Sequence, residues 1–326
     1  MDIRSLKHEA QVMADNAKEP PRKIVFLHTV IALGASAVLG LISLLLELYG
    51  PKGSGLSGLG TRAVLSTAQV VLQLSSTVLM PFWSAGLIFA MLGYARGDSI
   101  APRDLVAGFR RFRPVLSSGL MMGLQYLSRG MISAYLSGIL VMVTPFAKPA
   151  YELVLLLQEN PDLDLMAANV EGLPGFYAAT MIIFLLVFTL WTLPVFYRYR
   201  MVNYRIMDEG NVGGLKALLQ SRMMMHQRRW KLFRLDLSFW WFYGLELLLS
   251  VLPLGAALMD VVGIGLPIPS NVAGWLLQLL AAAGRLALYT FAGPKLELTY
   301  ALCYRQFLLG PEPPKPKKPV VHPWTY

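Results

Sequence analysis

The sequence predicts an all-α polytopic membrane protein, a bundle of six transmembrane helices with two short cytoplasmic interfacial helices. Of its 326 residues, 55% are apolar and only 15% are charged, whereas soluble domains carry about 25% charged residues. Six apolar runs each meet or exceed the roughly 20 residues that a membrane span needs. Lys and Arg gather in every second connection between these runs, which is the pattern that orients helices in a bilayer.

The chain begins with a polar arm of mixed charge, residues 1–23, in which residues 3–17 are expected to form an interfacial helix. The first apolar run continues past Ala35-Ser36-Ala37 through LGLISLLL, which favours an uncleaved helix over a signal peptide. The predicted membrane domain covers residues 24–310, with spans at about 24–49, 63–94, 115–145, 174–197, 235–258 and 272–292.

Two prolines should mark these helices. Pro81 is expected to kink the second span, and Gly293-Pro294 should break or kink the sixth before a last helical piece that ends at Leu309. The tail over residues 311–326 is rich in proline and lysine, and this composition predicts a disordered cytoplasmic end.

The two interfacial helices are predicted in the basic connections 96–113 and 198–234. Pro102 should begin the first, with Leu105, Val106 and Phe109 on one side. The second has an apolar face of Leu215, Leu218, Leu219 and Met223 beside basic side chains, as in a helix lying among lipid headgroups. The basic residues expected to face anionic headgroups are Arg110, Arg111, Arg113, Lys216, Arg222, Arg228, Arg229 and Lys231.

Counting Lys and Arg by connection gives the orientation. The arm, the 96–113 and 198–234 connections and the part after the sixth span hold 24 of them, and the alternate connections hold three. Because positive charge stays on the cytoplasmic side, both termini are predicted to be cytoplasmic in a multi-pass protein of the plasma membrane. The acidic connection at 146–173 should lie outside.

Polar side chains recur within the spans and predict a polar seam between helices. Charges there are costly and usually face the interior of the bundle. Arg129, Glu246 and Arg285 lie at similar predicted depths, and the amides nearest to them are Gln125, Gln278 and Gln73. One interpretation is structural, with Glu246 neutralising one arginine and the amides joining helices. The other is a ligand site, because two arginines against one glutamate leave a positive charge uncompensated.

The leading functional hypothesis is a protein that binds or translocates a small anionic or amphiphilic ligand, such as a lipid or peptide, through this seam. The alternative is a non-transporting scaffold or regulatory partner that binds the anionic inner leaflet or another membrane complex. Membrane lipids with anionic headgroups are the expected partners, and a membrane-protein partner or a second copy of the chain stays open.

Several classes of function are disfavoured. Cys303 is the one cysteine and the four histidines are scattered, so neither a disulfide nor a metal site is expected. No P-loop, HExxH or GxSxG motif occurs, and no enzymatic activity or cofactor is predicted. The basic residues adjoin apolar helices instead of forming a soluble face, which disfavours nucleic acid as a partner.

The segment SRMMMHQRRWKLFRLDLSFWWF, residues 221–242, resembles the hallmark of an uncharacterised bacterial integral-membrane family, domain of unknown function 975. Its "KWRLF-x-L-x-LSF-x-x-W" pattern corresponds to residues 229–241 here, and residues 86–112 are similar to the family's Arg-Gly-acidic turn with an Asp-Leu…Gly-Phe helix. The resemblance covers about residues 20–310. It departs at the RRW, where Gly-His-Lys-Trp is usual, and in the long proline tail. It implies no activity.

The two basic connections also resemble each other. Each follows a span through a tyrosine, turns at an acidic-glycine site (Gly97-Asp98 and Glu209-Gly210), forms a short amphipathic helix and returns through arginines. This pattern indicates an internal duplication, as transporters often show. The alternative is that any cytoplasmic hairpin of a basic protein has these features.

Overall fold

The computed structural model describes residues 2–17, 19–49, 56–159, 173–255 and 270–309. Every regular element in these ranges is a helix, which confirms the predicted all-α class. The chain divides into two compact units: unit 1 is Met1–Ser117 with Met201–Tyr326, and unit 2 is Ser118–Arg200. The predicted tail at 311–326 lies outside the described residues, as do the side chains of Glu47 and Gln73.

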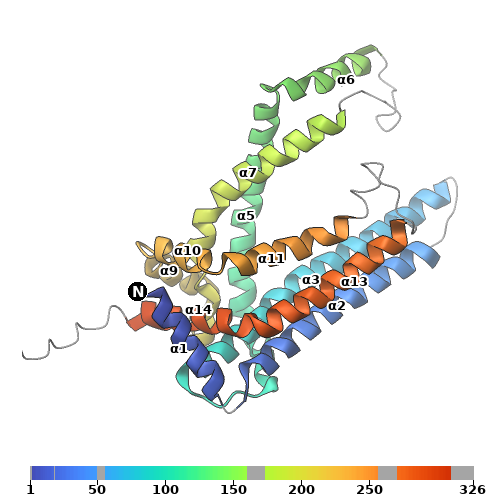
Figure 1. Cartoon of the computed structure of the whole chain (residues 1–326). Coiled ribbons are helices and arrows are strands. Elements are labelled where there is room, and N and C mark those ends of the chain that lie inside the picture. Colours follow the sequence, from blue (N-terminus) through green and yellow to red (C-terminus); the bar gives the residue numbers. More distant parts are fainter. Residues whose placement is uncertain (1, 18, 50–55, 160–172, 256–269, 310–326) are drawn as a thin grey trace, which may run out of the picture. The chain divides into compact units, whose positions relative to one another are not determined.

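Unit 1 is built from long apolar helices and from short helices at their basic ends. Among the long helices, α2 packs against both α3 and α13, and the shorter α11 packs against α13 (Figure 1). At the basic end, α8 packs against α3 and α9, while α14 packs against α1 and α3. These elements are α1 Ile3–Asn16, α2 Pro21–Tyr49, α3 Leu56–Arg96, η1 Pro102–Val106, α4 Ala107–Arg110, α8 Val202–Glu209, α9 Gly214–Met224, α10 Arg229–Leu237, α11 Trp240–Val251, η3 Leu252–Leu254, α13 Ser270–Phe291 and α14 Gly293–Leu309.

The core of unit 1 lies where α14, α8 and the C-terminal half of α3 meet. Tyr300 and Tyr304 of α14 are at most 1% exposed, as are Met91 of α3 and Ile206 of α8. A fully buried aromatic or aliphatic side chain of this size contributes about 1.5–3 kcal/mol through the hydrophobic effect. This core fixes the short basic helices on the end of the long ones.

Unit 2 contains most of α5 (Phe112–Val141), then η2 (Pro145–Ala147), α6 (Lys148–Glu159) and α7 (Leu173–Tyr199). Two serines of α5, Ser133 and Ser137, are at most 1% exposed, so this side of the helix is buried. Gly130 lies against α7, because a Cβ added to it would be 3.6 Å from the ring of Phe188.

The helices have the lengths and surfaces expected of a membrane protein. Within the described residues three are long and apolar enough to cross a bilayer: Pro21–Val38 in α2, Val78–Arg96 in α3 and the stretch Gly175–Glu209. The number rises to five if each of two bent pairs is one span, α5 with α6 (96°) and α13 with α14 (49°). Large apolar side chains cover the exposed faces, and soluble monomers rarely show apolar patches of that extent.

The elements at the two prolines are partly as predicted. The bend between α13 and α14 confirms the predicted break at Gly293-Pro294. Pro81 lies inside α3, which continues as one helix to Arg96, and the kink expected there stays a prediction. The predicted interfacial helix at Pro102 is a 3₁₀ turn followed by one α turn. Its Leu105 is buried whereas Val106 is 44% exposed, so these two side chains do not share one side as expected.

The predicted fifth span, 235–258, differs most from the structure. Its first residues belong to α10, and the chain bends at Ser238 and Phe239 before α11 begins. The Ser238 hydroxyl donates to the carbonyl of Leu235 (2.6 Å), and the Ser238 carbonyl accepts from the ammonium of Lys7 (2.7 Å). The side chains therefore take up backbone groups that a continuous helix would use. At 12 residues, α11 is about 18 Å long, less than the roughly 30 Å of a bilayer core.

The two turns that the sequence compares have one feature in common. Gly97 and Gly210 both have positive φ, at 85° and 71°, and each follows the end of a helix, α3 or α8. A glycine in this conformation is the usual way to end a helix. The internal duplication stays a hypothesis. The two glycines are one local feature that the two connections share.

Gly86 tests the packing of η1 on α3. A Cβ at this position would overlap the carbonyl of Leu105, so Gly86→Ala should destabilise the fold by about 1–3 kcal/mol. The matched control is Gly34→Ala on α2, where no other atom lies within 4 Å of the new Cβ. Thermal unfolding in detergent should show a lower midpoint for the first variant alone. Equal midpoints would mean that η1 does not pack this closely.

Candidate functional site

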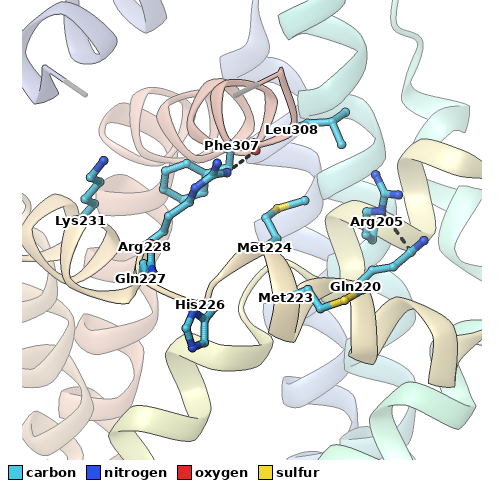
Figure 2. A pocket seen from close by; sticks show the side chains of 10 residues that line it. All are labelled: Arg205, Gln220, Met223, Met224, His226, Gln227, Arg228, Lys231, Phe307 and Leu308. Carbon is cyan, nitrogen blue, oxygen red and sulfur yellow. Dashed lines mark hydrogen bonds between the residues drawn. The ribbon is translucent and has the colours of Figure 1, made fainter. Parts of the chain in front are cut away.

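A cavity of about 700 Å³ lies at the basic end of unit 1, where α8, α9, α10 and the end of α14 meet. Figure 2 shows the ten side chains that surround it, with Met224 between the guanidinium groups of Arg205 and Arg228 in this view. The size is typical of a pocket for a small ligand. It is lined by Arg205, Gln220, Met223, Met224, His226, Gln227, Arg228, Lys231, Phe307 and Leu308.

A tight turn between α9 and α10 forms one wall of this pocket. Met225 is fully buried and anchors the turn, and the N–H of Arg228 donates to the Met225 carbonyl (3.2 Å). Gln227 has φ of 73°, the single positive φ among the described non-glycine residues. A non-glycine residue rarely adopts this conformation, and such strain gathers at functional sites.

Three basic side chains give the pocket its charge. Arg228 donates to the carbonyl of Phe307 and lies over the Phe307 ring, 5.3 Å from its centroid. Arg205 forms an ion pair with Glu209 and donates to the side-chain oxygen of Gln220 (3.1 Å). Lys231 is exposed and forms no ion pair with any described residue. Of Arg205, Arg228 and Lys231, only Arg205 has a carboxylate partner among the described residues, so the pocket is positive.

The remaining wall is apolar. Met223 is 69% exposed and Leu308 is 43% exposed, and the half-buried Met224 lies beside them. Methionine side chains are flexible and adapt to ligands of irregular shape. A positive floor with an apolar side suits an anionic group that carries a hydrocarbon part.

The structure brings together one pair of the predicted seam. Glu246 of α11 and Arg285 of α13 form an ion pair, with Oε1 and Nε 3.4 Å apart. The guanidinium of Arg285 also donates to the hydroxyl of Ser250 (2.8 Å), which itself donates to the carbonyl of Glu246 (2.7 Å). Arg285 is thus compensated, which agrees with the structural interpretation of the seam.

The other residues predicted for the seam are not brought to this pair. Arg129 belongs to unit 2, where its guanidinium donates to the carbonyl of Gln125 (3.0 Å) and the Gln125 amide donates to the Tyr199 hydroxyl (3.4 Å). Gln278 is exposed, and the Gln73 side chain lies outside the described residues. A seam shared by all three charges stays a prediction.

The eight basic residues predicted to face lipid headgroups have two kinds of surroundings. Arg110, Arg113, Lys216, Arg222 and Lys231 are exposed. Arg111, Arg228 and Arg229 are half-buried, and the first two bind backbone carbonyls of other elements. Burial and the nearby guanidinium of Arg96 lower the pKa of Arg111 from its ordinary value.

Four basic side chains of unit 1 cap the C-terminal ends of helices. Lys7 donates to Ser238 at the end of α10 (2.7 Å), Arg111 to Ile206 in the last turn of α8, Arg228 to Phe307 in the last turn of α14, and Arg305 to Ala95 in the last turn of α3. The last carbonyls of a helix lack intrahelical partners and carry negative partial charge. The sequence predicted this role for none of the four, because the pairing depends on which helices pack together.

The role of Asp208 also follows from the packing of the helices. The sequence places it in an acidic turn, and in the structure its carboxylate forms an ion pair with Arg96 and accepts from the Tyr304 hydroxyl (2.9 Å). This carboxylate joins α8 to α3 and α14. No group of three or more His, Cys, Asp or Glu residues that could hold a metal ion occurs in the part of the chain that the structure describes.

A family model described as "Protein of unknown function (DUF975)" matches residues 1–307. The chain belongs to this family, and the resemblance of its basic segments is thereby confirmed. The proline-rich tail, which departs from the family pattern, follows the matched residues. Searches of curated proteins and of solved structures found no match.

Asp208→Asn tests the junction at Asp208. The amide cannot compensate Arg96, so we expect unfolding to become easier by about 1.5–3 kcal/mol, the contribution of a hydrogen bond to a charged group. Glu19→Gln is the matched control, since the ion pair of Glu19 with Lys23 is exposed and should contribute under about 1 kcal/mol. Chemical denaturation in mild detergent would measure both. If the two variants lose equal stability, Asp208 is not a junction.

Proposed function

We propose that this chain is a multi-pass plasma-membrane protein with both termini in the cytoplasm, and that it binds an anionic, amphiphilic ligand at its cytoplasmic face. The ligand class is an anionic phospholipid, bound by its phosphate. The pocket of Figure 2 supports this most directly, because it combines three cations with an apolar wall. Arg228 and Lys231 line the pocket and have no carboxylate partner among the described residues, and Lys231 is exposed.

Six crossings remain the proposed number. They are the three long helices, the two bent pairs and the shorter α11. The orientation is supported by the distribution of Lys and Arg, which places α8, α9 and α10 in the cytoplasm. The pocket then lies at the level of the inner-leaflet headgroups, whose phosphates attract basic residues by about 1 kcal/mol for each Lys or Arg.

The pocket is a better place for the ligand than the seam. Arg285 already has Glu246 and Ser250 as partners, so the polar groups of that pair are used within the fold. Binding there would require the ligand to replace an ion pair inside the helices. The pocket requires no such exchange at Lys231. The proposal is for binding, and it includes no chemical step at the pocket.

A second candidate is the scaffold or regulatory protein that docks on the inner leaflet, and one observation favours it. Leu215, Leu219 and Met223 form a stripe along α9 and are 56–69% exposed, whereas Leu218, predicted to lie on the same face, is buried against the fold. Lys216 and Arg222 flank the stripe and are exposed as well. A helix of this kind lies in the plane of the headgroups.

Cysteine labelling tests the orientation. In a Cys303→Ala background, Lys216→Cys on α9 should react with a membrane-impermeant maleimide only after the membrane is opened, because the basic side is cytoplasmic. Lys148→Cys on α6 should react in intact cells, and both positions are exposed. Reaction of Lys216→Cys in intact cells would reverse the topology and remove the ligand site from the cytoplasm.

Lys231→Gln tests the pocket. The variant keeps a polar side chain and removes one cation, so affinity for dihexanoyl phosphatidylglycerol should fall by about tenfold, or about 1.4 kcal/mol. The measurement is thermophoresis of the purified full chain in neutral detergent, with the phosphatidylcholine analogue as the neutral ligand.

Lys216→Gln is the matched control, since Lys216 is exposed on the same segment but does not line the pocket. A ligand pocket predicts that this variant binds like the wild type. Equal losses in both variants would favour the leaflet-docking scaffold, and no loss in either would end the proposal of a binding site.

A further inference from the structure

A second cavity, distinct from the pocket of Figure 2, is a groove of about 580 Å³ between α11 and α13. Its length is lined by Leu245 and Leu248 of α11 and by Gly284 and Leu288 of α13. Leu248 is 60% exposed, so the groove opens on the outer surface of two helices that lie in the membrane part of unit 1. A lipid-facing groove with these walls is complementary to a hydrocarbon chain.

The two ends of the groove differ in chemistry. At one end are Phe239, Trp241 and Lys295, next to the bend between α13 and α14. Aromatic and basic side chains gather at the boundary between hydrocarbon and headgroups. The leucines lie farther along α11, at the other end. The groove therefore runs from headgroup depth into the hydrocarbon.

A second ammonium group lies beside the polar end. Lys7 of α1 has its Nζ 3.8 Å from the centroid of the Phe239 ring, and that ring lines the groove. Burial and the charge of Lys295 both lower the pKa of Lys7 from its ordinary value, as expected of two like charges close together. Neither lysine forms an ion pair with a described residue. An anion between them would compensate both.

We propose that the groove is a binding site for an anionic phospholipid, with its phosphate at Lys7 and Lys295 and one acyl chain along Leu245, Leu248 and Leu288. A zwitterionic lipid would offer the same acyl chain, but its own cationic group would be repelled by the two ammonium groups, neither of which has a carboxylate partner among the described residues. A free phosphate would leave the apolar walls unused. Charge and shape together select the lipid.

The ion pair of Glu246 and Arg285 gives this site its form. Glu246 follows Leu245 and Arg285 follows Gly284, so the pair holds α11 against α13 directly behind the groove. Gly284 leaves the space that the Leu249 side chain fills, since a Cβ there would lie 2.6 Å from it. This ion pair thus positions the walls of the proposed lipid site.

The test is photolabelling of the full chain in phosphatidylcholine nanodiscs. A trace of phosphatidylglycerol with a diazirine in mid-chain should label α11 and α13 around Leu245 and Leu288, more strongly than the matching phosphatidylcholine probe. Lys295→Gln should lower this labelling by about tenfold relative to the wild type. Lys231→Gln, which alters the pocket of Figure 2, should leave it unchanged.

A groove-filling pair provides the second readout. Ala287→Trp places a large side chain in the groove and should abolish the labelling, whereas Ala283→Trp, exposed on the same helix outside the groove, should not. Equal labelling by the two probes would show ordinary contact with surrounding lipid and would overturn the proposal, as would full labelling of Lys295→Gln. Loss in Lys231→Gln without loss in Lys295→Gln would overturn it while the pocket stands.

Discussion

The capping of helix ends by basic side chains from other elements is the interaction on which unit 1 depends. Every helix leaves its last carbonyls without intrahelical partners, and those groups carry a partial negative charge. In this chain α3, α8, α10 and α14 all end in the same basic region, where water, lipid or another side chain must complete them. Arg305, Arg111, Lys7 and Arg228 do so in turn. Each of these bonds also joins two segments that are far apart in the sequence.

The same charges thus have two physical roles. Their number and their gathering in alternate connections match the pattern that orients helices in a bilayer. Their individual positions follow from the helix ends. Lys7 ties the N-terminal helix to α10, and Arg305 ties α14 to α3, so that both terminal segments hold the centre of the unit. A substitution that keeps the charge count but shifts a lysine by one residue would satisfy the first requirement and violate the second.

The sequence predicted what depends on hydropathy and charge, and it missed what depends on contacts between helices. The bend at Gly293-Pro294 and the helix after residue 3 were predicted because proline and amphipathic spacing act locally. One interpretation of the sequence had Glu246 neutralise one of two arginines, because charges at one depth tend to pair, and the structure shows that this arginine is Arg285. The bend at Ser238 was not foreseen, because the residues LDLSFWW contain no helix breaker. The bend coincides with a contact from far away in the sequence, the hydrogen bond that Lys7 donates to the Ser238 carbonyl.

The site could be predicted only in part for the same reason. The sequence singled out the basic segment, yet it treated the eight cations alike. The structure separates exposed ones such as Lys231 from Arg228, which is committed to the end of α14. Phe307 and Leu308 belong to the pocket although they are about 80 residues away from it in sequence. No local pattern marks such residues, because their role follows from the packing of α14 on the short helices.

Helix α10 explains why the two proposed lipid sites would lie at one depth. Its nine residues extend about 13 Å, and they include Arg229, Lys231, Arg234 and Asp236, which exclude the helix from the hydrocarbon. Trp230 near its start and Trp240 just after its end are 67% and 69% exposed, as aromatic anchors of an interfacial helix would be. Lys231 of the pocket lies near the start of α10 and Phe239 of the groove lies just after its end, so a position of α10 along the membrane surface would put both at one depth. A lipid phosphate at either end of α10 would then meet cations at the same depth, where the capped helix ends also lie.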